Sequence, residues 1–202
     1  MPLRVISGSA RGRKLKLVPG DNTRPIMDRV KEALFNIIGI DIRDTVFLDL
    51  FAGTGSVGIE ALSRGAAEAL FIDLDKIAIK TIHQNLAVTR LAEHAIVRRL
   101  DAFTLLAAQP DREYDYIYVA PPQYEGLWLR TLQALDKNPA WIPPGATVIA
   151  QLDPKESETV EFTHLELTDE RRYGNTSLWF FVAREPEDAD EAENESDQSP
   201  AN

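Results

Sequence analysis

The spacing of hydrophobic positions changes at about residue 45, and this change separates two kinds of predicted structure. Before it, a helix opened by Pro25 and ended by Gly39 has its apolar positions on one face. These positions are Val30, Leu34, Ile37 and Ile38. After it, short apolar runs alternate with stretches of helical spacing. The first run, residues 46–50, is almost continuously apolar, as in a strand buried on both faces.

The alternation of strands and helices continues to about residue 183. We expect strands at residues 46–50, 69–73, 96–100, 114–119, 147–151, 163–168 and 177–183. We expect helices between them at residues 56–64, 76–89, 103–107 and 125–136. Such an order gives a doubly wound, seven-stranded, mostly parallel α/β sheet with an antiparallel hairpin at its C-terminal end.

The residues before the first helix have a different pattern. Residues 3–7 and 14–18 are two short apolar-containing runs joined by the link GSARGR, which predicts a small β-hairpin. We therefore divide the chain into a basic N-terminal hairpin at residues 1–22, an α/β domain at residues 23–184 and a tail at residues 185–202.

Charge follows the same division. The 202 residues carry a net charge of -10. The tail holds eight acids and no Lys or Arg, and it has almost no bulky apolar residue, so we expect it to be disordered. Residues 1–31 hold eight bases against two acids. A basic head on an otherwise acidic chain favours a polyanionic partner.

Composition excludes several function classes. The chain has no cysteine, which excludes disulfides, thiolate metal sites and a cysteine nucleophile and fits a cytoplasmic location. No apolar run is as long as a membrane span, and no signal peptide is visible, so no membrane partner is expected. The three histidines, His83, His94 and His164, lack metal-ligand spacing, so we expect no metal.

A glycine loop follows the first strand of the predicted sheet. Gly53, Gly55 and Gly58 fit G-x-G-x-x-G, the pattern of a loop that cradles a nucleotide-type cofactor. Asp49 stands just before the loop, where it would repel a pyrophosphate and attract an ammonium or sulfonium group. The loop therefore suits S-adenosylmethionine better than a nicotinamide dinucleotide. The alternative is an ordinary tight turn between a strand and a helix.

Acidic residues also follow the next two strands. Asp73 ends the second strand and can accept hydrogen bonds from both ribose hydroxyls, and Asp101 ends the third, where it can accept one from an adenine amino group. Ligands of open α/β sheets bind beyond the carboxyl ends of the strands, which is where these acids are expected. The alternative for each aspartate alone is a helix-capping role.

Taken together, these residues resemble a known family. The chain is similar to bacterial methyltransferases that modify the exocyclic N2 of a guanine in 16S ribosomal RNA. The likeness runs from residue 3 to about residue 183. It is carried by the segments RVISGSARGRKL, TRPIMDRVKEALFNI, DLFAGTGSVGIEALSRGA, FIDLDKIAIKTIHQNL, DAF and RRYGNTSLWFF.

The resemblance implies a Rossmann-like methyltransferase fold, S-adenosylmethionine as cofactor and a monomer that acts on 16S rRNA in the small ribosomal subunit. Its implied cofactor-binding residues are Asp49, Phe51, Ala52, Gly53, Thr54, Gly55, Asp73, Leu74, Asp101 and Ala102. Its implied catalytic face is bordered by Arg24, Pro25, Asp28 and Arg29, with Asp28 among the catalytic candidates.

One motif departs from the family. The usual Asp-Pro-Pro followed by Tyr or Phe is replaced by Ala120, Pro121, Pro122, Gln123 and Tyr124. A carboxylate or amide oxygen in this motif, with a backbone carbonyl, would orient the weakly nucleophilic guanine amine, and the aromatic ring would stack on the extruded base. Either the Pro121 carbonyl with Gln123 and Tyr124 still does so, or Asp28 or Tyr118 takes over, or the enzyme is slow or inactive.

The basic residues Arg11, Arg13, Lys14, Arg24 and Arg29 are the RNA-contact candidates, because clustered cations bind a phosphate backbone without reading sequence. The alternative is an edge hairpin kept soluble by its charge. The predicted function is rRNA guanine-N2 methylation. Its rivals are a methyltransferase acting on another amino group, a non-catalytic RNA-binding assembly factor, and a nicotinamide dehydrogenase, which Asp49 disfavours.

Overall fold

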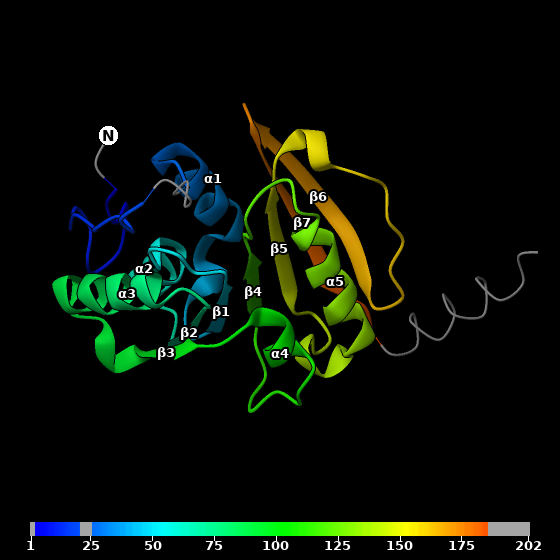
Figure 1. The fold of residues 1–202 in the computed structure, drawn as a ribbon, viewed down its shortest axis with the longest axis horizontal. Helices are drawn as coiled ribbons and strands as arrows, with labels where there is room; N and C mark the ends of the chain where they lie inside the picture. Colours follow the sequence, from blue (N-terminus) through cyan, green and yellow to red (C-terminus); the bar gives the residue numbers. More distant parts are fainter. Residues whose placement is uncertain (1–2, 21–25, 186–202) are drawn as a thin grey trace, which may run out of the picture.

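The computed structural model describes residues 3–20 and 26–185. Within them, seven strands form one sheet in the order β3-β2-β1-β4-β5-β7-β6 (Figure 1). The parallel strands are β1 (Val46–Leu50), β2 (Glu68–Asp73), β3 (Ala95–Arg99), β4 (Tyr116–Val119) and β5 (Thr147–Leu152). The last two strands, β6 (Leu165–Tyr173) and β7 (Thr176–Ala183), are antiparallel.

Helices cover both faces of the sheet (Figure 1). One face packs against α1 (Asp28–Ile38), α2 (Ser56–Arg64) and α3 (Lys76–Thr89). The other packs against α4 (Ala102–Leu106) and α5 (Leu127–Lys137). Strand β1 therefore contributes side chains to both cores: Phe47 to the first, Leu48 and Leu50 to the second. This confirms the α/β fold class, including the antiparallel C-terminal pair.

The sequence prediction is closest for the elements that flank the glycine loop. Strand β1 and helices α2 and α3 have the expected bounds, and Gly39 and Gly65 end their helices with positive φ, as glycine allows. The other strands and helices deviate by a few residues, mainly at β6, which extends to Tyr173. The antiparallel pairing of β6 with β7 is as predicted, but the weak apolar signal beyond residue 168 did not predict that β6 extends to Tyr173.

Two predictions are wrong in part. In α1, Val30, Leu34 and Ile38 are buried as expected, but Ile37 is 41% exposed. Phe35 and the whole side chain of Lys31 complete the buried face instead. The N-terminal segment, residues 3–20, pairs antiparallel as expected for a hairpin, through backbone hydrogen bonds between residues 3–5 and 12–15 and a bridge between Arg4 and Lys14. Its paired runs are shorter than the predicted strands. Pro25 and the tail beyond residue 185 lie outside the described residues, as does the expected boundary between residues 22 and 23.

The N-terminal segment is held against the helices by buried polar groups of α2. The fully buried Glu60 accepts hydrogen bonds from the backbone N–H groups of Ile6 (2.8 Å) and Ser7 (2.9 Å). Ser63 Oγ accepts one from the Ala10 N–H (2.9 Å) and donates one to the Ser7 carbonyl (2.6 Å). The segment is therefore fixed to the α/β body by specific bonds as well as by its apolar residues.

A buried ion cluster surrounds Glu60. The ammonium of Lys31, on α1, lies 3.5 Å from Glu60 and donates to the carbonyl of Arg4 (2.7 Å), while the Arg64 guanidinium lies 2.9 Å from the other Glu60 oxygen. Burial lowers the pKa of Lys31, and the charge of Glu60 opposes that shift. Removing one of these charges would therefore leave another buried charge without its partner, which costs free energy of folding.

Replacing Glu60 with alanine should therefore destabilise the fold by about 3–5 kcal/mol, because it leaves Lys31 as an uncompensated buried charge and two backbone N–H groups unpaired. The matched control is Asp169→Ala, which removes an exposed ion pair with Arg171 and should cost less than about 1 kcal/mol. Urea unfolding followed by circular dichroism measures both. Equal losses for the two variants would contradict the assignment.

Candidate functional site

The glycine loop begins where β1 ends and is fastened to the end of β2. The Ala52 N–H donates to the Ile72 carbonyl (2.9 Å), and the Gly53 N–H donates to Asp73 Oδ2 (2.7 Å). Gly53 and Gly55 have φ values of 54° and 72°, a left-handed conformation that favours glycine. The loop, including Ala52 and Thr54, is buried apart from Phe51, which is half-buried.

Asp49 lies beneath this loop and is 2% exposed. Its Oδ2 accepts a hydrogen bond from the Gly58 N–H (3.0 Å) in the first turn of α2. A Cβ at Gly58 would lie 2.4 Å from the Phe71 ring, so this third glycine permits the close approach of α2 to the sheet. The three glycines thus allow both the left-handed conformation of the loop and the close packing of α2 on the sheet. That packing brings the Gly58 N–H to Asp49.

Burial raises the pKa of Asp49 to about 8, and the nearby charge of Asp73 adds to this shift. Among the described residues, no Lys, Arg or His forms an ion pair with Asp49. A buried carboxyl without a cationic partner costs free energy that a cationic ligand would recover. The site therefore fits the ammonium and sulfonium charges of S-adenosylmethionine and disfavours a pyrophosphate.

The two acids at the next strand ends lie beside the loop. Asp73 is half-buried, and its oxygens accept from the N–H groups of Gly53 and Asp75, so it ties the loop to the start of α3. Burial raises the pKa of Asp73. The Leu100 N–H donates to the Asp73 carbonyl (3.1 Å), which places Asp101 at the adjoining strand end.

Asp101 has the helix-capping role that was weighed against ligand binding. Its Oδ1 accepts from the Thr104 N–H (2.8 Å) at the start of α4. Capping through one oxygen does not preclude ligand contact through the other, so its adenine role stays a prediction. The neighbouring candidates differ in exposure: Leu74 is exposed and Ala102 is buried.

Phe51 connects the glycine loop to a helix on the other face of the sheet. It has a positive φ of 60° and an edge-on contact with Phe103 of α4, at a centroid distance of 6.4 Å. The Arg130 guanidinium lies 4.7 Å from the centroid of the Phe103 ring, a cation–π contact. These aromatic contacts link the glycine loop to α4 and α5.

The motif after β4 runs from the half-buried Ala120 through Pro121, Pro122 and Gln123 to an exposed aromatic residue. Tyr124 is 66% exposed and has a positive φ of 65°. Its N–H donates to Glu156 (2.7 Å) and its hydroxyl donates to Asp153 (2.7 Å). Tyr124 is therefore held at its backbone and at its hydroxyl, while its ring stays exposed to solvent.

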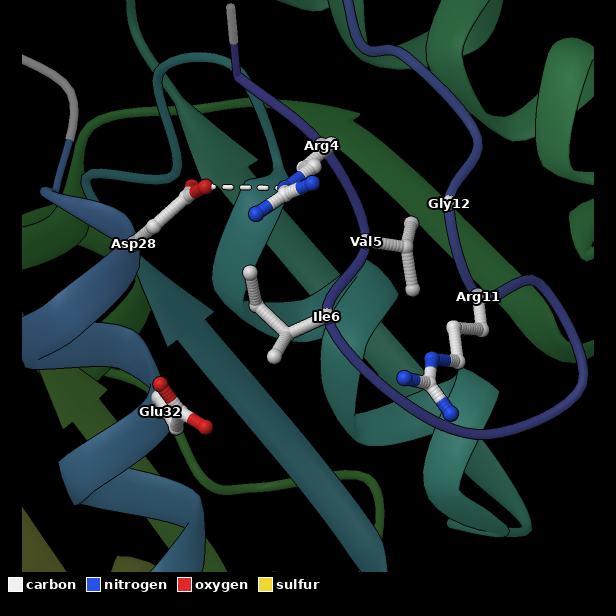
Figure 2. Close-up of a pocket in the computed structure, with 7 residues that line it drawn as sticks. All are labelled: Arg4, Val5, Ile6, Arg11, Gly12, Asp28 and Glu32. Atoms are coloured by element: carbon white, nitrogen blue, oxygen red, sulfur yellow. Dashed lines mark hydrogen bonds and ion pairs between the residues drawn. The ribbon is translucent and has the colours of Figure 1, made fainter. Parts of the chain in front are cut away.

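The two residues considered as substitutes for the missing acid are both engaged elsewhere. The Tyr118 hydroxyl is buried and donates to Gln151 Oε1 (2.6 Å). Asp28 Oδ2 accepts from Arg4 Nε at 3.1 Å across a pocket of about 220 Å³ that Arg11 and Glu32 also line (Figure 2). The carboxylate of Asp28 thus faces the N-terminal segment.

The basic candidates that the structure describes lie on the surface. Arg11, Arg13, Lys14 and Arg29 are exposed, and Arg13 donates to the Val88 carbonyl at the end of α3 (3.1 Å). Arg24, like Pro25, lies outside the described residues. Three of the exposed bases project from the same N-terminal segment that Glu60 and Ser63 hold in place.

One residue in the site was missed by the sequence analysis. Asn85 of α3 is fully buried and contacts both the glycine loop and the N-terminal segment. An asparagine within a helix gives little signal by itself. A polar residue three positions after Ile82, on the apolar face of α3, was the available clue.

Two features are absent from the part of the chain that the structure describes. No helix there is long and apolar enough to cross a membrane. No group of three or more His, Cys, Asp or Glu side chains in residues 3–20 and 26–185 could hold a metal ion.

Comparisons with known proteins show which proteins this chain is similar to. The chain is 40% identical over 185 residues to YlbH of Bacillus subtilis (strain 168), covering 90% of this chain and 100% of that protein. It is 38% identical over 149 residues to ribosomal RNA small subunit methyltransferase D of Escherichia coli (strain K12), covering 74% of each. The solved structure of yhhF from Escherichia coli superposes with a TM-score of 0.80 at 32% identity, covering 91% of this chain and 99% of that one.

The family model described as conserved hypothetical protein 95 matches residues 3–182. The match includes the N-terminal segment, the glycine loop, the motif after β4 and both antiparallel strands. The chain belongs to the conserved hypothetical protein 95 family, and its predicted resemblance to the small-subunit rRNA methyltransferases is confirmed.

Proposed function

We propose that this protein transfers a methyl group from S-adenosylmethionine to the exocyclic N2 of a guanine in 16S rRNA of the small ribosomal subunit. The observation that carries the proposal is the buried Asp49 carboxyl beneath a glycine loop, without a cationic partner among the described residues. Membership of a family that includes a ribosomal RNA small subunit methyltransferase supports the substrate class.

The cofactor would be held by the loop and the acids around it. Asp49, Gly53 and Gly55 line its methionine part, Asp73 accepts from the ribose, and Asp101 accepts from the adenine amino group. When bound, S-adenosylmethionine supplies an electrophilic methyl group on a sulfonium sulfur. The remaining candidates, which lie next to these residues in the chain, complete the walls: Phe51, Ala52, Thr54, Leu74 and Ala102.

The motif after β4 orients the guanine amine. The N2 lone pair is delocalised into the ring, so the amine reacts only when its N–H groups are held by acceptors that localise the pair. The carbonyl of Pro121 and the side-chain amide oxygen of Gln123 are these acceptors, because the side chain of Ala120 offers none. The exposed ring of Tyr124 stacks on the extruded base, and its two hydrogen bonds hold it in place.

The N-terminal segment binds the RNA backbone. Its exposed Arg11, Arg13 and Lys14, with Arg29 at the start of α1, form a basic surface suited to phosphates. We further propose that the division into a basic segment, an α/β domain and an acidic tail holds in solution, and that the protein acts as a cytoplasmic monomer.

A second candidate function is favoured by one observation. Ala120 removes the acid that the family motif supplies, and neither Tyr118 nor Asp28 is free of other hydrogen bonds. Losing one oriented acceptor commonly lowers the rate about a hundredfold to a thousandfold. The alternative is therefore a ribosome-assembly factor that binds RNA and cofactor and is catalytically weak or inactive.

Labelled methyl transfer to small ribosomal subunits that lack the modification tests the proposal. We expect label on guanine N2, at a rate that rises about tenfold or more in the Ala120→Asp variant, because the added carboxylate is a stronger acceptor than an amide. We also expect Tyr124→Ala to slow transfer. Label on another nucleoside would contradict the assigned substrate, and no label with measurable binding of subunits and cofactor would favour the assembly factor.

Replacing Asp49 with asparagine should have opposite effects on two quantities: it should weaken cofactor binding and raise the free energy of unfolding. The amide oxygen can still accept from Gly58, so the loop keeps its support. Because the folded-state pKa of Asp49 is above its ordinary value, the wild-type free energy of unfolding falls as pH rises from about 4 to 8. At pH 8 the asparagine variant should be at least about 1 kcal/mol more stable, yet bind S-adenosylmethionine about tenfold or more weakly.

Urea unfolding and calorimetric titration measure the two effects. The control is Asp136→Asn, which alters a carboxylate that also accepts backbone N–H groups but lies on α5, on the other face of the sheet. This variant should leave cofactor affinity unchanged. Unchanged affinity in Asp49→Asn would remove the charge argument for the cofactor.

A further inference from the structure

The helix α3 contacts both the glycine loop and the N-terminal segment through a single side chain. Asn85 Oδ1 accepts a hydrogen bond from the Lys16 N–H (2.7 Å). Its Nδ2 donates to the Lys16 carbonyl (3.0 Å) and to the Thr54 carbonyl (2.9 Å). Thr54 is the residue between Gly53 and Gly55, so one amide group joins the two segments proposed to bind the two substrates.

Within the described residues, the side-chain amide of Asn85 makes these three hydrogen bonds and no others. The side chain is fully buried, so solvent cannot replace any of its three hydrogen bonds. Both N–H groups and the oxygen are engaged, which fixes the orientation of the amide. A shift of the Lys16 backbone therefore moves or breaks the bond to Thr54, and a shift of the loop acts on Lys16 in the same way.

The surroundings make this link stiff. Ile82, one turn before Asn85, packs against Gly55, where an added Cβ would lie 3.2 Å from its side chain. Arg13 donates to the Val88 carbonyl one turn after Asn85. Helix α3 thus contacts the loop at its Ile82 turn and the basic segment at its Val88 turn, with Asn85 between them.

We propose that Asn85 is a positioning residue that couples cofactor binding at the glycine loop to RNA binding by the N-terminal segment. It touches neither ligand. It sets the position of Lys16 and hence of the exposed Lys14 and Arg13, relative to the loop that holds the cofactor. Because coupling between two sites is reciprocal, the cofactor tightens RNA binding by the same factor by which RNA tightens cofactor binding.

This inference rests on the proposed function, and its test keeps the two apart. The dissociation constant for small ribosomal subunits is measured with and without saturating S-adenosylhomocysteine. For the wild type the ratio of the two constants should be at least about fivefold. In Asn85→Asp, whose carboxylate faces the carbonyls of Lys16 and Thr54 instead of donating to them, the ratio should fall to about one.

The matched control is Ser63→Ala. Ser63 also holds the N-terminal segment, through Ser7 and Ala10, but makes no hydrogen bond to the glycine loop. This variant should bind subunits more weakly while keeping the wild-type ratio. A wild-type ratio of one with both ligands bound, or a wild-type ratio retained in Asn85→Asp, would overturn the coupling. Failure of the wild type to bind subunits or cofactor would instead overturn the proposed function.

A measurement on the wild type covers the case in which Asn85→Asp does not fold. Hydrogen exchange of the Lys16 amide, which donates to Asn85, should slow when S-adenosylhomocysteine binds. Exchange of the Ala10 amide, which donates to Ser63, should change much less. Equal changes at the two amides, or no change at Lys16, would overturn the proposal.

Discussion

The hydrogen bond from the Gly58 N–H to the Asp49 carboxyl is the constraint on which the rest of the site depends. It joins the first turn of α2 to the middle of the sheet, and the absence of a side chain at Gly58 lets the helix approach Phe71 closely enough to form it. The position of α2 fixes the glycine loop before it. The same helix carries Glu60 and Ser63, which hold the N-terminal segment.

Two binding surfaces are thereby built on one rigid group of helices. The loop that suits a cofactor and the basic segment that suits RNA are far apart in sequence, yet both are tied to α2 and α3 by buried polar side chains. Such groups are costly to bury and stabilise only a structure in which every partner is in place. The N-terminal segment thus behaves as part of the catalytic body, although it forms almost no regular structure of its own.

The sequence predicts those parts whose signal is local. The apolar run of β1, the glycines that start and end α2, and the acids at successive strand ends each follow from a few neighbouring residues. Glu60, Ser63 and Asn85 could not be assigned in this way, because the backbone groups to which they bond lie 31 to 69 residues away and are brought to them only by folding. The N-terminal strands are shorter than predicted for a related reason. Residues 3–5 and 12–15 bond to each other, but the N–H groups of Ile6, Ser7 and Lys16 bond to side chains of α2 and α3 instead.

We infer that Asp49 serves a cationic ligand, at a cost to the stability of the unliganded fold. Proton release on cofactor binding tests it most directly, by calorimetry at pH 7 in buffers of different ionisation enthalpy. With a pKa of about 8 the carboxyl is mostly protonated before binding, and a bound cation favours its ionised form. We expect the wild type to release about one proton per cofactor beyond any released by Asp49→Asn. Equal proton release by the two proteins would contradict it.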